Sequence, residues 1–405
     1  MKKVPLRFIR GGITAPQGFI ASGVAVGIKY SGRKDLSLIY SAKPAAVAGV
    51  FTTNQMKAAP VLYDQKIVRG GVAQAIISNS GCANAGTGPA GYADTLAVAR
   101  LAAQQLKLSP SRILVCSTGA IGTRLPLLKM RKGIQAAALR LSRAGSSDAA
   151  HAIMTTDLVS KEVAAEFLIA GRPVRIGAIA KGSGMIQPNM ATMLAFISTD
   201  AAASASFLRT ALAQAVNVSF NRITVDNEQS TNDTVLLLAN GASGAPAIRP
   251  GSREAKVFQE ALTAICVQLA KMIARDGEGA TKLIEVNVRG ARTEKDAARI
   301  ALRVAGSDLM KAAVHGGDPN VGRILAAVGA TPVSIRANNV SVWIGQVPMA
   351  RNGSALLQNE KNGEKEMRKD PVRFMIDLGM GKASATAWGC DLSAQYVTIN
   401  AKYRT

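Results

Sequence analysis

Strand-like and helix-like segments alternate along nearly the whole chain, and this alternation limits the folds that the chain can adopt. Residues 72–77 and 113–116 are short apolar runs of the kind found in buried strands. Residues 94–106 and 127–141 carry apolar residues at three- and four-residue spacing, which predicts amphipathic helices. With 405 residues, the chain is long enough for two domains or one large one. We therefore expect an α/β or α+β fold of layered helices and sheets.

The second half of the chain continues the pattern. Ser204 and Ser252 stand where a serine can cap a helix, and the helix after Ser252 is expected to end near Arg275. A short strand is expected to end at Ile197. Alternating or β-branched residues predict further half-buried strands at 283–288, 342–347, 372–378 and 396–399.

The run KGSGMIQPNMATMLA joins a glycine-rich loop to an apolar strand through Thr192. A threonine hydroxyl needs an adjacent base to become a good nucleophile, and one known base is the threonine's own α-amino group. A free amine there requires the Ala191-Thr192 peptide bond to be cut. Gly182 and Gly184 allow the tight backbone from which a hydroxyl can attack the preceding carbonyl. A strand-leading loop with an incidental threonine fits the same local composition.

This run resembles the self-cleavage site of the ornithine acetyltransferase family, also called glutamate N-acetyltransferases. Members of that family split into two chains and use the new N-terminal threonine. Further matching blocks are NSGCANAGTG from Asn79, STGAIG from Ser117, AIMTTD from Ala152, STNDT from Ser230, RDGEGATK from Arg275, HGGDPNVGRI from His315 and DLSAQYVTINAKYRT from Asp391. Because these blocks fall in order along nearly the whole chain, the resemblance is specific.

The resemblance implies helices packed on stacked β-sheets, in an N-terminal-nucleophile-like fold with a second, smaller C-terminal lobe. Cleavage would divide the chain into an N-terminal (alpha) chain, residues 1–191, and a C-terminal (beta) chain, residues 192–405. The two fragments are expected to stay associated and to form a heterotetramer with two copies of each.

The resemblance also implies roles for single residues. The nucleophile is Thr192, the bond cut lies between Ala191 and Thr192, and the oxyanion hole is the Thr118 hydroxyl with the Gly119 backbone N–H. The implied substrate-binding residues are Thr155, Lys181, Thr192, Glu278, Asn400 and Thr405. Lys181 can pair with a carboxylate and Glu278 with an ammonium group, the two charges that N-acetylornithine carries. An ordinary surface pair is the alternative for these two residues.

The reaction implied is a ping-pong acetyl transfer in arginine biosynthesis. Thr192 attacks the acetyl carbonyl of N-acetylornithine, ornithine leaves, and the amine of glutamate attacks the resulting ester to give N-acetylglutamate. No cofactor and no metal are expected. Acetyl-CoA is a possible second acetyl donor.

The formal net charge of +23 departs from the near-neutral or acidic balance expected of that family. Such a charge can bind nucleic acid, but the Lys and Arg residues are scattered and aromatic residues make up only 4% of the chain. Nucleic-acid binding is therefore not expected, whereas the positive potential favours acidic metabolites and phosphorylated cofactors. No apolar run is long enough to span a bilayer, since 262–274 is broken by Gln268 and Lys271. A cytoplasmic location is expected.

Histidine and cysteine offer few other catalytic arrangements. His151 and His315 are the only histidines, expected on a helix surface and in a loop at a helix end, so a serine or cysteine triad has few possible members. The four cysteines are expected to be reduced and partly buried, because they are widely spaced and form no CxxC pair: Cys82, Cys116, Cys266 and Cys390.

Three departures from the family pattern bear on substrate choice or assembly. The block TVDNEQ stands where a more acidic, glycine-containing stretch is expected, Val321 replaces a usual tryptophan, and TTDLVSKE lacks a usual proline. Two rival functions stay open. An N-terminal-nucleophile amidohydrolase or peptidase would pass the acyl group to water, and a basic, non-enzymatic binding protein would remain uncut.

Overall fold

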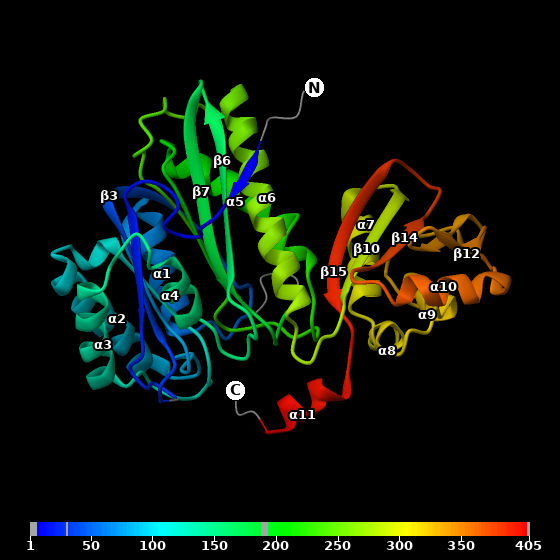
Figure 1. Ribbon diagram of the computed structural model, residues 1–405, viewed down its shortest axis with the longest axis horizontal. Coiled ribbons are helices and arrows are strands. Elements are labelled where there is room, and N and C mark those ends of the chain that lie inside the picture. The colour runs from blue at the N-terminus through cyan, green and yellow to red at the C-terminus, as the bar shows by residue number, and fades with distance from the viewer. Residues whose placement is uncertain (1–5, 30, 188–192, 403–405) are drawn as a thin grey trace.

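The computed structural model describes residues 6–29, 31–187 and 193–402. Two lobes are visible in Figure 1, a large one and a smaller one made of residues 283–390. Within these ranges each lobe has its own sheet, of nine strands in the large lobe and six in the small one. The expected mixed α/β class with a smaller C-terminal lobe is confirmed.

The large sheet has the strand order β1-β6-β7-β8-β9-β3-β4-β5, with β2 paired to β3 outside that path. Its strands are β1 (Arg7–Ile9), β2 (Phe19–Val24), β3 (Leu36–Phe51), β4 (Val72–Asn79), β5 (Ile113–Ser117), β6 (Lys161–Ile169), β7 (Arg172–Lys181), β8 (Leu194–Thr199) and β9 (Thr234–Ala239). The long strand β3 joins the two halves of the sheet. Its first part pairs with β2 and β4, and its last part, from Ala46, pairs with β9.

The two halves of this sheet stack face to face. Side chains alternate across a strand, and Ile76 of β4 and Phe196 of β8 belong to one core cluster that lies between the halves. Their neighbours Ile77 and Ile197 belong to two different outer clusters. The expectation of stacked sheets is therefore confirmed, in the form of one sheet folded over.

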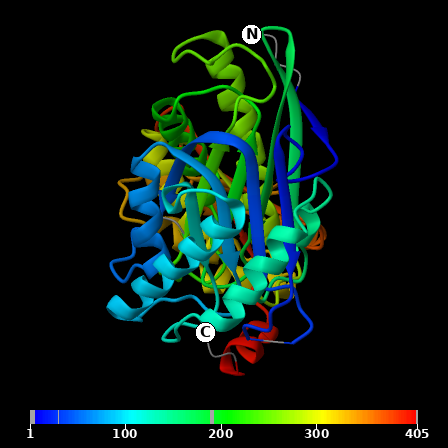
Figure 2. The ribbon, with the colours of Figure 1, turned by 90° about the vertical axis from the view of Figure 1, so that its left-hand side faces the viewer.

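Helices cover both outer faces of the folded sheet. The half that contains β4 and β5 is covered by α1 (Ala59–Arg69), α2 (Gly88–Leu106) and α3 (Leu127–Leu139). Figure 2 shows helices of this group in front of the strands. The half that contains β7 and β8 is covered by α5 (Ala205–Asn217) and α6 (Arg253–Arg275). A short helix, α4 (Ser146–Ala152), contributes to the core between the halves.

The expected helix caps are confirmed. The Ser204 hydroxyl accepts a hydrogen bond from the Phe207 N–H at 3.2 Å, and the Ser252 hydroxyl accepts one from the Ala255 N–H at 3.1 Å. Among the described residues, α6 is the one helix long and apolar enough to cross a membrane. Its apolar side packs into the core against β6 and β7, which accounts for that composition.

The small lobe has a separate core. Its strands, in the order β13-β12-β11-β14-β10-β15, are β13 (Ser354–Ala355), β12 (Val347–Arg351), β11 (Ser341–Ile344), β14 (Val372–Asp377), β10 (Leu283–Ala291) and β15 (Ala383–Cys390). Its helices are α7 (Glu294–Ala305), α8 (Asp308–Gly316), α9 (Val321–Gly329) and α10 (Glu360–Met367). After β15 the chain returns as α11 (Ala394–Lys402), below the junction of the lobes in Figure 1.

Two predicted elements differ from the structure. The expected strand at 396–399 is part of α11, because the chain leaves the sheet after Cys390 and Ser393 starts a helical turn by accepting the Gln395 N–H at 3.2 Å. The β-branched residues there suggested a strand, but they have no neighbouring strand to pair with. The expected strand at 342–347 is two strands, β11 and β12, joined through Gly345 at φ +57°.

The expected division after residue 191 falls inside the large sheet. Strands β8 and β9, which follow that point, lie between β7 and β3, which precede it. Six residue pairs join β7 to β8, and six join β9 to β3. The two segments therefore share one sheet and one core.

Candidate active site

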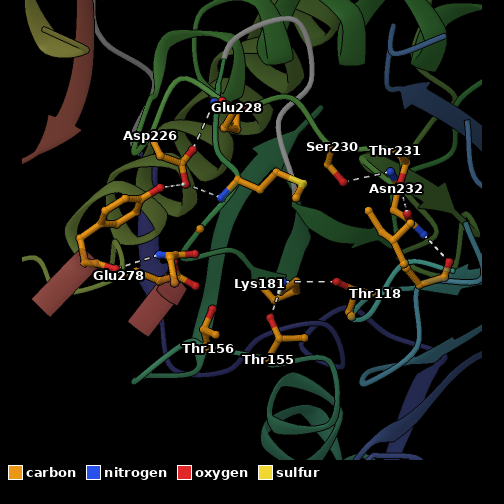
Figure 3. Close-up of a pocket in the computed structure, with 17 residues that line it drawn as sticks. Thr118, Thr155, Thr156, Lys181, Asp226, Glu228, Ser230, Thr231, Asn232 and Glu278 are labelled. Carbon is orange, nitrogen blue, oxygen red and sulfur yellow. Dashed lines mark hydrogen bonds between the residues drawn. The ribbon is translucent and has the colours of Figure 1, made fainter. Parts of the chain in front are cut away.

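A pocket of about 130 Å³ lies beside the end of β7, and α11 contributes to its lining. Six residues singled out from the sequence line it together: Thr118, Gly119, Thr155, Lys181, Glu278 and Asn400. They come from segments as far apart in sequence as β5 and α11, and Figure 3 shows several of them facing one space. Ala191, Thr192 and Thr405 lie outside the described residues.

Thr118 and Gly119 directly follow β5, at a turn that only glycine fits. Gly119 has φ +129°, and a Cβ there would lie 2.4 Å from the carbonyl carbon of Gly81. The side-chain amide of Asn232 holds the neighbouring loops by donating to the Ala83 carbonyl at 2.7 Å and the Ser117 carbonyl at 2.8 Å. The turn is thus fixed from two sides.

Lys181 ends β7 and is buried, so it is not part of an ordinary surface pair. Its Nζ donates to Thr155 Oγ1 at 2.8 Å and lies 3.3 Å from Thr118 Oγ1 (Figure 3). Burial lowers the pKa of Lys181, and the nearby Asp157 carboxylate opposes that shift. A partly desolvated ammonium group held between two hydroxyls can bind a substrate carboxylate.

A buried ion network lies behind Lys181. Lys161 is fully buried, and its Nζ donates to Asp157 Oδ1 at 2.8 Å and to Asp276 Oδ2 at 2.6 Å. Asp157 also accepts the Thr155 N–H at 3.0 Å and the Gly182 N–H at 2.7 Å. Burial raises the pKa of Asp157, but the Lys181 and Lys161 charges and the hydrogen bonds outweigh it and lower that pKa to about 2. The network therefore fixes the backbone directly after Lys181 and the backbone of Thr155, whose hydroxyl accepts from Lys181.

Glu278 is placed by the same network and by α11. The backbone carbonyl of Asp276, two residues earlier, accepts a hydrogen bond of 2.7 Å from the Ser183 hydroxyl. The Glu278 N–H donates a hydrogen bond of 2.9 Å to the Ser183 carbonyl. The Asn400 amide donates to Glu278 Oε2 at 2.8 Å. The carboxylate also lies over Gly184, where a Cβ would be 2.5 Å from it. Glu278 is therefore buried and held in the pocket wall.

Sequence reasoning assigned no role to several other residues that line the pocket: Thr156, Asp226, Glu228, Ser230, Asn232 and Tyr396. All of them lie in or beside blocks that carried the resemblance, but acid and amide side chains in such blocks have many possible roles. Asp226 lies in the TVDNEQ block that departs from the family pattern. The sequence drew attention to that block without indicating that its acidic residues reach the pocket.

Asp226 supports the opposite wall of the pocket. Its carboxylate accepts the N–H groups of Met185 at 2.6 Å and Ile186 at 2.7 Å, and the Tyr396 hydroxyl lies 3.4 Å away. Met185 has φ +57°, a conformation that costs a non-glycine residue energy and that these hydrogen bonds stabilise. Burial raises the pKa of Asp226. Among the described residues that line the pocket, Asp226, Glu228 and Glu278 supply three carboxyl groups and Lys181 is the one lysine.

The start of β8 is fixed beside the pocket. The Met193 N–H donates to Asp233 Oδ1 at 2.8 Å, and the Thr234 N–H donates to the Met193 carbonyl at 3.1 Å. Leu194 pairs with Lys181 across β7 and β8, so residue 193 comes next to the pocket lysine. Burial raises the pKa of Asp233 well above its ordinary value.

The histidines and cysteines lie elsewhere. His151 is exposed on α4, as expected, but the placement of His315 in a loop is wrong: it lies in α8 and its Nδ1 is 2.8 Å from Asp391 Oδ2. The four cysteines are free and buried, as expected. Within the described ranges, His, Cys, Asp and Glu form no group of three that could hold a metal ion.

The folded-over sheet carries a pocket with a glycine turn, hydroxyl groups and a buried lysine, groups that acyl-transferring enzymes use to hold a substrate and to stabilise an oxyanion. The ArgJ family model matches residues 20–405, and the chain belongs to the ArgJ family. A relative from Symbiobacterium thermophilum, "Arginine biosynthesis bifunctional protein ArgJ", is 51% identical, covering 99% of this chain and 100% of the relative. A relative of the same name from Caldanaerobacter subterraneus is 46% identical, with the same coverage.

Two solved structures are similar to parts of this chain. The crystal structure of ArgJ from Bacillus halodurans is 40% identical with a TM-score of 0.50, covering 51% of this chain and 98% of that chain. A chain from Mycobacterium tuberculosis, solved as ornithine acetyltransferase complexed with ornithine, is 46% identical with a TM-score of 0.43, covering 45% of this chain and 98% of that chain.

Proposed function

We propose that this chain transfers the acetyl group of N-acetylornithine to glutamate through an ester on Thr192. The observation that carries the proposal is the single pocket in which Thr118, Gly119, Lys181 and Glu278 meet although they are far apart in sequence. Support also comes from the relatives, which are named for arginine biosynthesis, and from the Mycobacterium tuberculosis relative solved as ornithine acetyltransferase.

The first half-reaction forms the ester. The free α-amine of Thr192 takes the hydroxyl proton, Oγ1 bonds to the acetyl carbon, and the Thr118 hydroxyl and Gly119 N–H stabilise the oxyanion. The C–N bond to ornithine then breaks, and the leaving amine takes a proton from the Thr192 ammonium group. Losing one oxyanion donor costs about 100- to 1000-fold in rate in comparable sites.

The second half-reaction returns the free enzyme. The amine of glutamate attacks the ester carbonyl, the C–Oγ1 bond breaks, and Thr192 Oγ1 recovers a proton while N-acetylglutamate leaves. The Lys181 ammonium can hold the α-carboxylate of either substrate, because both substrates carry one. Glu278, with Asp226 and Glu228 nearby, suits the side-chain ammonium group of ornithine.

We also propose that Thr192 is released by self-cleavage of the Ala191-Thr192 bond. The buried Asp233 carboxyl group holds the N–H of residue 193, so it fixes the chain directly after the bond to be cut. Intact mass of the denatured protein should show two fragments in the wild type and one uncut chain in Thr192→Ala. Thr192→Ser is the matched control, because it keeps a hydroxyl and should still cleave. An uncut wild-type chain would contradict the proposal.

A transfer assay separates the proposal from the amidohydrolase alternative. The cleaved enzyme is incubated with N-acetylornithine, with and without glutamate, and the products are quantified by mass spectrometry. N-acetylglutamate that forms in step with ornithine supports acetyl transfer. Free acetate at the same rate with and without glutamate identifies water as the acceptor and overturns it.

Assembly, location and chemistry complete the proposal. We expect a heterotetramer of two alpha and two beta chains, which light scattering of the purified protein tests, and a cytoplasmic location, which cell fractionation tests. The steps above use only groups of the chain and the substrates. Activity is therefore expected to survive dialysis against a chelator, without an added cofactor.

A further inference from the structure

A small cavity of about 20 Å³ meets the active-site pocket at Thr155, which lines both. A volume of this size has room for a small polar group but not for a whole amino acid. On the pocket side, the Thr155 hydroxyl accepts a hydrogen bond from Lys181 (Figure 3). This side cavity therefore lies next to the lysine that is expected to hold the α-carboxylate of either substrate.

The backbone of Gly81 separates the side cavity from the turn at Gly119. A Cβ at Gly119 would lie 2.4 Å from the Gly81 carbonyl carbon, and a Cβ at Gly81 would lie 2.8 Å from the Cβ of Lys29. Gly81 has φ +92°, a conformation that favours glycine. The Lys29 side chain therefore begins one thickness of backbone away from the proposed oxyanion hole.

The segment between β2 and β3 is folded so that it reaches the side cavity. The Asp35 carboxylate accepts the N–H groups of Val26 at 2.7 Å and Ile28 at 2.6 Å. Its backbone carbonyl accepts the Ser80 N–H at 2.9 Å, which joins the segment to the other wall of the cavity. Both carboxylate oxygens of Asp35 are thus used to hold backbone, although Asp35 lines the cavity.

Basic side chains from this segment line the side cavity: Lys29, Arg33 and Lys34. Lys34 forms an ion pair with Asp148 of α4, which offsets its charge. Arg33 is exposed, and none of the carboxylates in the described ranges forms an ion pair with it. The side cavity therefore presents positive charge directly beside a pocket that is rich in carboxyl groups.

This contrast matters because the side chains of the two proposed substrates carry opposite charges. Ornithine ends in an ammonium group, which suits Asp226, Glu228 and Glu278. Glutamate ends in a carboxylate, which the same three groups repel. Both substrates have to bring their α-amine to the acetyl group and their α-carboxylate to Lys181. Their side chains therefore need separate places.

We propose that the side cavity binds the side-chain carboxylate of the acyl acceptor, an acidic amino acid, through Arg33 and Lys29. The inference rests on the proposed acetyl transfer and adds a separate place for the acceptor side chain. With the α-carboxylate at Lys181, the side chain passes Thr155 into the side cavity, where the Arg33 guanidinium donates paired hydrogen bonds to the carboxylate. These cations distinguish glutamate from glutamine, which has the same shape and no charge.

Calorimetric titration of the whole protein with glutamate, glutamine and ornithine tests the site, with no acetyl donor present. Arg33→Glu should weaken glutamate binding by about tenfold or more, because hydrogen bonds to a charged group are lost and a like charge is added. Its affinity for glutamine and ornithine should not fall. Arg33→Ala removes the attraction without adding a repulsion, so it should weaken glutamate binding less and in the same direction.

Arg140→Glu is the matched control, because it makes the same charge change at an exposed arginine that follows α3 and lines neither cavity. It should bind glutamate as the wild type does, and equal melting temperatures exclude misfolding. Loss of the preference for glutamate over glutamine in the Arg33 variants alone supports the site.

Three results would overturn it: no glutamate binding by the wild type, equal wild-type affinity for glutamate and glutamine, or equal weakening by Arg33→Glu and Arg140→Glu. Binding is measured without turnover, so the result is separate from the acetyl-transfer assay. A wild type that prefers glutamate but forms no N-acetylglutamate would support the side cavity and contradict the proposed transfer.

Discussion

Asp157 and Lys161 lie behind the active-site pocket, yet they fix three of the side chains that line it. Asp157 accepts the N–H groups of Thr155 and of Gly182, the residue after Lys181. Lys161 joins Asp157 to Asp276, which leads to Glu278. Removing one partner of such a buried ion network leaves an uncompensated charge. The precision of the site therefore depends on residues that touch no substrate in the proposed reaction.

The pH dependence of kcat/KM in a variant of Asp157 tests whether Asp157 acts on the site through the charge of Lys181. Its carboxylate raises the pKa of Lys181 against the effect of burial, so Asp157→Asn should lower that pKa further. The Lys181 ammonium form would then be lost at a lower pH as pH rises. We expect the alkaline limb of kcat/KM to move to lower pH, with KM rising more than kcat falls.

The matched control for this substitution is Asp148→Asn, which removes an exposed carboxylate from α4. Its pH profile should overlay that of the wild type. An unchanged alkaline limb in Asp157→Asn would show that Asp157 does not act through the charge of Lys181. The profile separates these cases because a merely structural defect lowers activity at every pH.

At the residue scale, the sequence allowed part of the site to be predicted. Thr118, Gly119, Thr155, Lys181, Glu278 and Asn400 were placed by resemblance, and the structure brings them together. Asp226 and Lys161 were not recognised, because a carboxylate or lysine in a single sequence does not reveal its burial. The i, i+4 spacing of Asp157 and Lys161 was visible, but that spacing is common on solvated surfaces.

At the scale of an element, the turn after β5 depends on backbone conformation. Gly119→Ala would force a Cβ to within 2.4 Å of Gly81, at a positive φ that costs about 1–3 kcal/mol for a residue with a side chain. The turn must shift, and with it the Gly119 N–H. We expect kcat to fall at least 100-fold, the cost of losing an oxyanion donor.

Gly122→Ala separates these two effects. Gly122 lies in the same loop at φ +86°, but a Cβ there meets no atom within 4 Å. Its melting temperature should fall by a few degrees from backbone strain, with kcat changed less than fivefold. If both variants lose activity equally, positive φ rather than close approach governs the turn.

Elements were predicted best where one local rule determined them. Ser204 and Ser252 are helix caps because a serine hydroxyl accepts a nearby N–H, whatever the fold around it. The prediction of a strand at 396–399 was wrong. A strand needs a neighbouring strand to pair with, and the local sequence pattern does not reveal whether one is present. Local sequence patterns also did not predict that β3 joins the two stacked halves of the large sheet. Stacked sheets were expected from the family resemblance alone.

At the scale of the whole molecule, the two segments on either side of residue 191 are interleaved. Strands β8 and β9 of the second segment are bonded on both sides to strands of the first. If the Ala191-Thr192 bond is cut, the fragments should therefore elute together from a sizing column in native buffer and separate only in denaturant. Fragments that separate in native buffer would contradict this arrangement.

The interleaved sheet has a consequence for how the protein can be made. We expect strands β8 and β9 to pair with β7 and β3 while all four strands still belong to one uncut chain. Closing a loop within one chain costs less entropy than bringing two separate molecules together. If the bond is cut only after that insertion, cleavage marks the chains that have folded correctly. The fraction of cut chain in a preparation would then equal the fraction of molecules that folded. A cut protein that has been denatured would refold only at high protein concentration, because its two fragments must meet again.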